Sequence, residues 1–207
     1  MSIGRRGVLI VIEGIDGSGK TCIAKELFRR LCSLKISTVY THEPFTTGFS
    51  KTLKELSGAI RDSIVETLAL AADRYVHIRS IIEPALRRGS VVICDRYYYS
   101  SIAYQGARGA DPEWIRIVNR YVIRPDLAIY LDVEPEEGLK RRYGMKSEWP
   151  QFETIKIIER ARQIYLDLVS QGELILVNAM RNFKEVVSDV WSLVEELLRS
   201  RSILRSL

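Results

Sequence analysis

Short apolar runs rich in Val and Ile alternate along the chain with longer segments in which apolar residues recur every three or four positions. The short runs have the length and content of buried strands, and the longer segments have the periodicity of amphipathic helices. Five strands are predicted, at 7–14, 37–41, 91–95, 126–133 and 173–178. Five helices are predicted, at 21–34, 63–89, 111–122, 152–172 and 182–200.

Buried strands that alternate with helices are typical of a parallel sheet covered by helices on both faces. The chain has 207 residues, which suit one domain, and we find no internal repeat or low-complexity linker. We therefore predict an α/β fold with a five-stranded parallel sheet, formed by residues 1–207 as a single domain. Ligands of such sheets bind just beyond the carboxyl ends of the strands, so we expect the chemistry there.

The amino-acid composition indicates the class of protein and its cellular compartment. Hydrophobic residues make up 46% of the chain and charged residues 28%, as in globular proteins. Glu13 interrupts the first apolar run, and no run is long enough to span a membrane. Cys22, Cys32 and Cys94 lack the spacing of metal ligands, so we expect buried free thiols. These features predict a cytoplasmic protein without a membrane partner.

The net charge of +5 comes from basic residues that are scattered along the chain. Proteins that bind nucleic acids usually gather such residues on one face, so we expect no nucleic-acid partner. The clearest basic cluster is LKRRYGMK, Leu139–Lys146. A small polyanionic ligand accounts for this charge as well as a nucleic acid does.

The first predicted strand is followed by GIDGSGKT, a G-x-x-x-x-G-K-[ST] pattern, and then by a predicted helix. Glycines let successive backbone N–H groups turn toward one phosphate, and the helix adds its positive end. In such loops the lysine contacts the β- and γ-phosphates, and the Ser or Thr hydroxyl ligates Mg²⁺. The predicted ATP-binding residues are Gly14, Ile15, Asp16, Gly17, Ser18, Gly19, Lys20 and Thr21.

A phosphate loop predicts a nucleoside-triphosphate site without naming the reaction. Switch GTPases, motor ATPases and small-molecule kinases all have one. We find no N-K-x-D element of the GTPase kind late in the chain, and the chain is small for a motor. The residues that follow the other strands are therefore needed to distinguish these classes of protein.

The strand at 91–95 ends in Asp95, and Arg96 follows it. An acidic residue at this position is suited to hold Mg²⁺ through water, and an arginine beside it is suited to bind phosphate with two parallel hydrogen bonds. A structural ion pair at a strand end is the alternative, but the phosphate loop on a neighbouring strand favours the functional interpretation.

Arg74 lies in the middle of the long predicted helix, beside Ala71 and Ala72. Such an arginine could lie across the helix toward a pocket. It could equally be solvated and pair with Asp73 or His77, and the pattern leaves both alternatives open.

Taken together, these stretches resemble the thymidylate kinases, a family of P-loop nucleoside-monophosphate kinases. The resemblance runs through IEGIDGSGKT, THEP, AADRYVHI, IIEPAL, ICDRYYYSSIAYQG, RPDLAIYLDVEPEEGLKRR and RARQIYLDL, in the family's order. Its most specific part is Ile93–Gln105. The resemblance implies a P-loop NTPase fold with helices on both faces of the sheet and a short lid at about 140–152. It also implies transfer of the γ-phosphate of Mg-ATP to dTMP, giving dTDP and ADP for dTTP synthesis.

The resemblance also implies a role for several positions. Asp16 would accept a hydrogen bond from the deoxyribose 3′-hydroxyl, and Arg96 would bind the dTMP phosphate. Tyr104 would lie beside the sugar 2′ carbon, where a ribose hydroxyl would be crowded. Arg74 would lie by the thymine and the acceptor phosphate, with Ser101 and Gln105 at the thymine edge. The substrate-binding residues implied in this way are Asp16, Glu43, Leu70, Arg74, Arg96, Tyr97, Ser101, Tyr104 and Gln105.

The catalytic prediction rests on charge neutralisation. The phosphate loop has no basic residue before Lys20, and members of the family with such a loop usually supply arginines from the lid. We therefore expect Arg141 or Arg142, with Lys146, to close over the phosphates; a solvated basic helix end is the alternative. The residues expected to act in catalysis are Lys20, Asp95, Arg96, Arg141 and Arg142, with Thr21 and Asp95 holding Mg²⁺.

Two positions depart from the family's pattern. His42 stands where an arginine is common, and Leu70 stands where a phenylalanine usually stacks on the thymine. These two departures leave open how strictly the protein selects thymine over uracil. A deoxynucleoside kinase or another nucleoside-monophosphate kinase is the nearest alternative, and a non-catalytic nucleotide-binding regulator or a nucleic-acid-dependent ATPase is a more distant one. The family forms homodimers, for which the apolar helix around 64–82 is suited.

Overall fold

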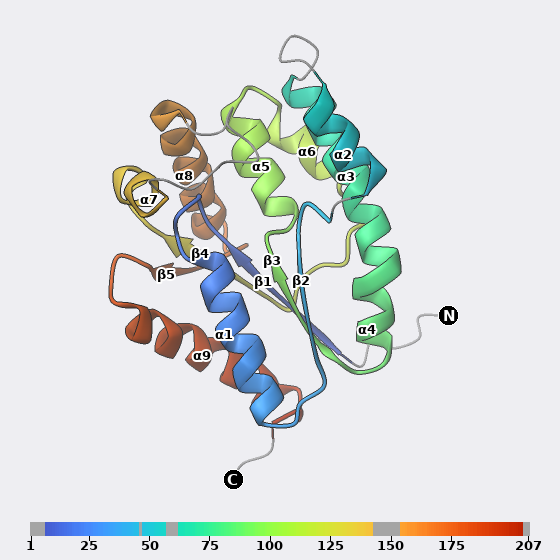
Figure 1. Ribbon diagram of the computed structural model, residues 1–207, viewed down its shortest axis with the longest axis vertical. Coiled ribbons are helices and arrows are strands. Elements are labelled where there is room, and N and C mark those ends of the chain that lie inside the picture. The colour runs from blue at the N-terminus through green and yellow to red at the C-terminus, as the bar shows by residue number, and fades with distance from the viewer. Residues whose placement is uncertain (1–6, 46, 57–61, 143–153, 205–207) are drawn as a thin grey trace.

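A computed structural model describes residues 7–45, 47–56, 62–142 and 154–204 (Figure 1). Five parallel strands form one sheet in the order β2-β3-β1-β4-β5. This arrangement confirms the predicted fold class and the position of every predicted strand. The strands are β1 (Val8–Glu13), β2 (Thr38–His42), β3 (Val91–Asp95), β4 (Leu127–Asp132) and β5 (Ile175–Asn178).

The three inner strands are apolar because both faces of the sheet are covered. Along β1 the side chains alternate between two cores. Ile10 and Ile12 pack with α1 (Lys20–Ser33) and α9 (Phe183–Ser200) on one face. Leu9 and Val11 pack on the other face with α5 (Tyr98–Ala107) and α8 (Ile155–Ser170), as Figure 1 shows.

The long helical segment predicted at 63–89 has three parts. It begins as α3 (Ser63–His77), continues as a π-helical turn, η1 (Ile78–Ile82), and ends as α4 (Glu83–Arg87). Pro84 lies in the first turn of α4, where a missing backbone N–H is tolerated. The helix α6 (Pro112–Val118) begins at Asp111, whose side chain caps it.

Three helices within the described residues were not predicted: α2 (Gly48–Glu55), α5, and α7 (Pro135–Arg141). Nearly all of α5 is buried, so it lacks the polar stripe by which an amphipathic helix is recognised. Most of the predicted lid, including Lys146, lies outside the described residues; its described part is the end of α7 and Arg142.

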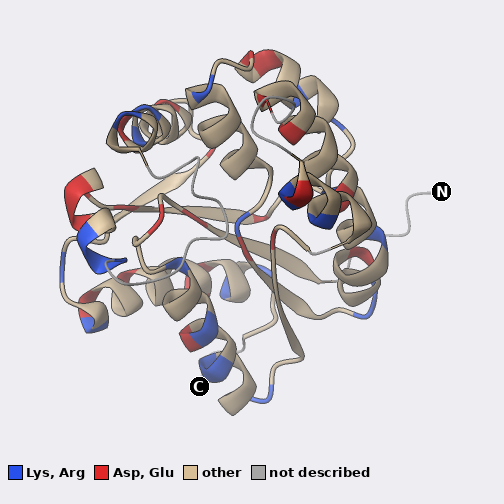
Figure 2. Ribbon diagram, turned by 45° about the horizontal axis from the view of Figure 1, so that its top comes forward, with Lys and Arg blue, Asp and Glu red and all other residues tan. Residues whose placement is uncertain are grey.

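The cysteine prediction was right about pairing and wrong about burial. All three thiols are free, but Cys22 and Cys32 are exposed and only Cys94 is buried. Both exposed thiols lie on the outer side of α1, away from the sheet. None of the described helices combines the length and apolar character needed to cross a membrane. Figure 2 shows Lys and Arg on helices all round the sheet, interspersed with Asp and Glu.

Candidate active site

The phosphate loop joins β1 to α1 and depends on its glycines. Gly17 has a φ of 82°, in the left-handed region that favours glycine, and a Cβ there would lie 2.1 Å from the Gly138 carbonyl oxygen. Lys20, the first residue of α1, is buried and donates from Nζ to the Ile15 carbonyl oxygen at 2.7 Å. The loop is therefore folded in the conformation that the motif predicts.

Lys20 lies in an unusual electrostatic environment. Burial and the nearby Arg96 guanidinium lower its pKa to about 8, although the carboxylates of Asp16 and Asp95 oppose this shift. A bound polyphosphate would supply the negative charge that favours the ammonium form. The position of the ammonium at the cavity, beside the Ile15 carbonyl oxygen, fits the phosphate contact expected of the motif lysine.

Thr21 and Asp95 meet at the carboxyl ends of two adjacent strands. The register pairs Ile12 of β1 with Asp95 of β3, and the Thr21 hydroxyl donates to Asp95 Oδ2 at 2.5 Å. Asp95 Oδ1 is buried and has no hydrogen-bond partner among the described residues. A buried carboxylate oxygen beside a hydroxyl is a donor set that fits Mg²⁺, so these two residues fit the metal site expected of them.

Arg96 follows β3 with a φ of 69°, in a region that few residues other than glycine occupy. This backbone turn directs its side chain across the mouth of the phosphate loop. The guanidinium pairs with the Asp16 carboxylate and donates to the Gly14 carbonyl oxygen and the Ser100 hydroxyl, each at 3.3 Å. Strain of this kind is common at functional sites.

Asp16 gathers three cations at one point. Arg142 donates from Nη1 to its Oδ2 at 3.1 Å, and Arg96 pairs with its Oδ1. Burial alone would raise the pKa of Asp16, but Arg96, Lys20 and Arg142 hold it below its usual value. An anion that entered here would meet two arginines and a lysine.

The two candidate lid arginines lie in different places. Arg142 lines the cavity, as does Asp16. Arg141 instead donates from Nη1 to the Ala179 carbonyl oxygen at 3.0 Å, and its Nε pairs with Glu137 on the same helix. The structure therefore brings Arg142 to Asp16 of the phosphate loop and places Arg141 against the segment that follows β5.

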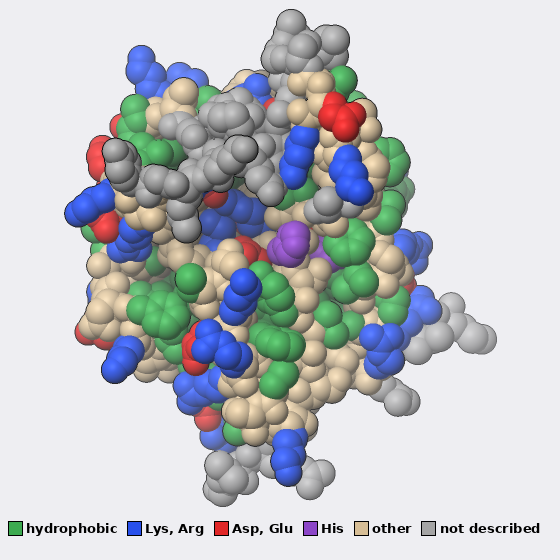
Figure 3. All heavy atoms as spheres, in the orientation of Figure 1, with side chains coloured by type: hydrophobic (Ala, Val, Ile, Leu, Met, Phe, Trp, Pro, Cys, Tyr) green, Lys and Arg blue, Asp and Glu red, His purple; other side chains and the backbone are tan. Residues whose placement is uncertain are grey.

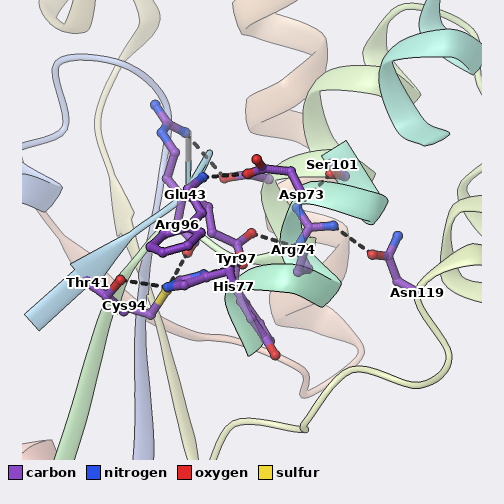
Figure 4. A network of polar contacts seen from close by, with 12 residues as sticks. Thr41, Glu43, Asp73, Arg74, His77, Cys94, Arg96, Tyr97, Ser101 and Asn119 are labelled. Carbon is purple, nitrogen blue, oxygen red and sulfur yellow. Dashed lines mark hydrogen bonds and ion pairs between the residues drawn. The ribbon is translucent and has the colours of Figure 1, made fainter. Parts of the chain in front are cut away.

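Arg74 is buried in a polar network at the other end of the cavity (Figure 4). Its Nε donates to Glu43 Oε2 at 2.6 Å. Its Nη1 donates to Asn119 Oδ1 at 2.6 Å and its Nη2 to Ser101 Oγ at 3.0 Å. The sequence left open whether Arg74 faces a pocket or is solvated. In the structure it is buried and lines the cavity. Nothing in the sequence pattern singled out Asn119, which ends α6 far along the chain.

Gln105 is held by a residue that sequence reasoning missed. Its Nε2 donates to Glu66 Oε2 at 3.3 Å, and Arg108 pairs with the same carboxylate. Glu66 is fully buried on α3. Because a carboxylate accepts hydrogen bonds and does not donate them, the amide N–H group of Gln105 is the one that faces Glu66.

The tyrosines of the stretch after Arg96 have different roles. Tyr104 lines the cavity, and its hydroxyl accepts a hydrogen bond from the Asp16 backbone N–H at 3.0 Å. Tyr97 also lines the cavity, while its hydroxyl donates to the Ile123 carbonyl oxygen at 3.1 Å. Tyr98 and Tyr99 are buried in the core, as packing residues.

Glu13 is a second residue that the sequence reasoning did not assign. It is fully buried at the end of β1 and accepts hydrogen bonds from the Tyr97 N–H at 2.7 Å, the Ser100 hydroxyl at 2.6 Å and the Tyr165 hydroxyl at 2.9 Å. Burial raises its pKa, although these donors and Arg96 oppose the shift. Glu13 thus fastens the start of α5 to the sheet, immediately beyond Arg96.

Most of the predicted site residues line one cavity of about 760 Å³. It opens as a hollow where basic, acidic and histidine side chains meet (Figure 3). His42 and Leu70 also line it. The predicted site residues that line the cavity are Asp16, Lys20, Thr21, Glu43, Leu70, Arg74, Asp95, Arg96, Tyr97, Ser101, Tyr104, Gln105 and Arg142. The remaining predicted loop residues, Gly14, Ile15, Gly17, Ser18 and Gly19, are not among the residues that line the cavity, and Ile15 is fully buried in the core.

A glycine-rich loop with a buried lysine, a hydroxyl–carboxylate pair and arginines around one cavity define a P-loop phosphotransferase. Comparison with known proteins gives the particular family. A sequence profile of the family described as "Thymidylate kinase" matches residues 12–190.

Curated relatives carry the same description. A probable thymidylate kinase from Staphylothermus marinus is 48% identical over 192 residues, which cover 93% of this chain and 96% of the relative. Probable thymidylate kinases from Pyrococcus abyssi and Thermococcus gammatolerans are 39% and 37% identical, with 93% and 94% of this chain and 98% and 99% of the relatives covered. The chain belongs to the thymidylate kinase family and is an ATP-binding kinase.

Proposed function

We propose that this protein transfers the γ-phosphate of Mg-ATP to dTMP, giving ADP and dTDP for dTTP synthesis. The observation that carries the proposal is the position of Arg96, which lies between the phosphate loop and the acceptor end of the cavity. An arginine there contacts the phosphate loop and would be placed to bind the phosphate of an acceptor nucleotide. Membership of the thymidylate kinase family supports dTMP as the acceptor.

The reaction needs in-line positioning and neutralisation of charge more than it needs covalent chemistry. Lys20 and the backbone of the phosphate loop would hold the β- and γ-phosphates of the donor. Arg96 would hold the phosphate of the acceptor, and Arg142 would neutralise charge at the transferred group. Mg²⁺, held by Thr21 and Asp95, would supply further neutralisation of the donor phosphates when bound.

The other end of the cavity supplies acceptor recognition. Arg74 offers hydrogen-bond donors, and the Glu66 contact turns the Gln105 amide so that its carbonyl oxygen is available to a ligand. This pairing suits a pyrimidine with a carbonyl at position 4 and an N–H at position 3, as in thymine. Tyr104, tied to the phosphate loop by Asp16 N–H, would stand against the sugar. Leu70 would cover the base with apolar area and no aromatic ring.

Steady-state ADP release with dTMP, dUMP, dCMP, UMP, AMP and thymidine as acceptors tests the proposal. We expect the largest kcat/KM with dTMP, a lower value with UMP because of its 2′-hydroxyl, and little activity with thymidine. A much larger kcat/KM with thymidine or AMP would overturn the assignment of dTMP as the acceptor and favour the alternative kinases.

We further propose that the protein acts as a homodimer in the cytoplasm. Large apolar side chains are exposed at spacings of four and eight along α3: Ile64 at 41%, Leu68 at 51% and Val76 at 41%. Ile117 on α6 and Tyr121 just beyond it are also exposed, and the Tyr75 hydroxyl ties α6 to α3 by donating to the Val118 carbonyl oxygen at 3.1 Å. Exposed patches of this kind mark protein interfaces.

Light scattering coupled to size exclusion tests this interface. We expect a dimer for the natural chain and a monomer for Leu68→Glu, with Phe49→Glu on α2 as a matched exposed control that leaves the dimer intact. A monomeric natural chain, or dissociation by both substitutions, would contradict the proposed interface.

A further inference from the structure

A chain of buried hydrogen bonds lies behind Arg74 and connects β2 to α3 (Figure 4). His77 is fully buried, and both of its ring nitrogens have partners. Nε2 lies 2.6 Å from the Thr41 hydroxyl oxygen, and Nδ1 lies 3.2 Å from Glu43 Oε1. The second oxygen of Glu43 accepts the hydrogen bond from Arg74 Nε at 2.6 Å. The order of contacts is therefore Thr41, His77, Glu43, Arg74.

The partners define the direction of each hydrogen bond. The Glu43 carboxylate accepts and does not donate, so His77 donates to it from Nδ1–H. The contact between the Thr41 hydroxyl and Nε2 occupies the other ring nitrogen. Every polar atom along this line has a partner, which is the condition for a buried polar network to be rigid.

The orientation of the His77 imidazole ring is also fixed by an aromatic contact. Phe45 stacks on His77 with ring centroids 4.5 Å apart and an interplanar angle of 15°. Asp73, on the same helix, fixes Phe45 by accepting its backbone N–H at 2.5 Å and fixes Thr47 by accepting its N–H at 2.9 Å. Side chains of α3 thus fix the segment after β2 through the stacking on Phe45 and the hydrogen bonds to the Phe45 and Thr47 N–H groups.

A metal site is not the explanation of this cluster. The Cys94 thiol lies within 4.8 Å of the His77 and Glu43 ligand atoms. However, Cys94 Sγ donates to the Arg96 carbonyl oxygen at 3.0 Å, and both His77 nitrogens are engaged in hydrogen bonds. Burial raises the pKa of this thiol well above its usual value, which disfavours the thiolate that a metal requires.

We propose that His77 is a positioning residue for the acceptor nucleotide: it orients the Glu43 carboxylate, which in turn orients the Arg74 guanidinium in the cavity. The inference rests on the proposed function, because it takes Arg74 as a contact of the acceptor. His77 itself does not line the cavity, so it acts on the nucleotide only through Glu43 and Arg74.

The two ring nitrogens can be tested separately with a matched pair of variants. In His77→Asn the side-chain amide stands near the position of Nδ1 and can still donate to Glu43. In His77→Gln the amide stands near Nε2 and keeps the Thr41 contact, but it loses the donor to Glu43. We expect KM for dTMP to rise roughly tenfold in His77→Gln, because the buried Glu43 carboxylate loses a hydrogen-bond donor, and by less than about threefold in His77→Asn, which keeps that donor. KM for ATP stays unchanged in both variants.

Val194→Ala, a fully buried truncation on α9 at the opposite face of the sheet, controls for lost stability. We expect it to lower Tm without changing KM for dTMP. Thr41→Val is a second variant that breaks the far end of the chain, and we expect a smaller rise in KM for dTMP. It tests the proposal if His77→Gln does not fold.

Equal effects of His77→Asn and His77→Gln on KM for dTMP would overturn the proposal, as would changes in KM that follow Tm in all variants including Val194→Ala. A folded His77→Gln with unchanged KM for dTMP would overturn it as well. If His77→Gln does not fold, an unchanged KM for dTMP in Thr41→Val would overturn it. These outcomes are distinct from a failure of the proposed function, which would show as the natural chain failing to phosphorylate dTMP.

Discussion

The guanidinium of Arg142 donates to the Asp16 carboxylate at 3.1 Å, whereas that of the adjacent Arg141 donates to the Ala179 carbonyl oxygen at 3.0 Å. Of these two neighbouring arginines, only Arg142 therefore contacts the phosphate loop, and Arg141 contacts the segment that follows β5. We expect Arg142→Ala to lower kcat by about 100- to 1,000-fold, because an arginine that neutralises the transferred phosphate acts mainly in the transition state. Single-turnover measurements of phosphoryl transfer check this directly.

Arg141→Ala is the matched control for Arg142→Ala. Its side chain pairs with Glu137 and the backbone at residue 179, so we expect kcat within about fivefold of the natural value. If Arg141→Ala loses as much kcat as Arg142→Ala, or more, the assignment of Arg142 to the transferred phosphate fails.

Arg96 should act on the acceptor more than on the donor. We expect Arg96→Lys to lower kcat/KM for dTMP by about 100-fold, since an ammonium cannot reproduce the two parallel hydrogen bonds of a guanidinium. Binding of a fluorescent ATP analogue should change by less than about threefold, because Lys20 and the loop backbone hold the donor. Equal losses in ATP binding and in use of dTMP would remove this role from Arg96.

The Thr21–Asp95 pair should set the requirement for Mg²⁺. We expect Asp95→Asn to raise the Mg²⁺ concentration for half-maximal activity by about tenfold or more at constant ATP, because a carboxylate oxygen is a stronger ligand of this ion than an amide. Thr21→Ser keeps the hydroxyl and should leave the Mg²⁺ dependence near that of the natural chain. An unchanged Mg²⁺ titration in Asp95→Asn would place the metal elsewhere.

Lys20 should produce a pH dependence that differs between the free and the substrate-bound enzyme. Burial and Arg96 lower its pKa to about 8 in the ligand-free protein, so kcat/KM for Mg-ATP should fall as pH rises through about 8. Bound phosphates favour the ammonium and raise this pKa, so kcat at saturating substrates should hold to higher pH. Kinetics from pH 6.5 to 10 would check both profiles.

Lys20→Arg is the control for this pH effect. Arginine stays protonated over the whole range, so the residual kcat/KM of this variant should lack the decline near pH 8. A decline that persists in Lys20→Arg would assign the titration to another group.

The strands and the phosphate loop could be predicted because a short stretch of neighbouring residues specifies each of them. A run of β-branched residues predicts a buried strand wherever it occurs, and the phosphate loop is specified by its own glycines. The helix α5 could not be predicted in this way. It is buried between α3, α6 and α8, so its apolar residues show no helical stripe.

The parts of the site that escaped prediction depend on contacts between distant residues. Asn119 reaches Arg74 across 45 positions, and Glu66 reaches Gln105 across 39. Neither residue lies in a motif, so only the packing of α3 against α5 and α6 identifies it. The choice between Arg141 and Arg142 is of the same kind, since one step along a helix turns a side chain by about 100° and decides which group it meets.

The central claim is that phosphate passes from ATP to a nucleotide that already carries one phosphate. The most direct test is incubation with Mg²⁺ and γ-labelled ATP in the presence of equimolar dTMP and thymidine, followed by separation of the labelled products. The account predicts label in dTDP, and predicts that Arg96→Ala abolishes this product while still binding ATP. Label in dTMP, which would arise from thymidine, or label released only as inorganic phosphate, would contradict it.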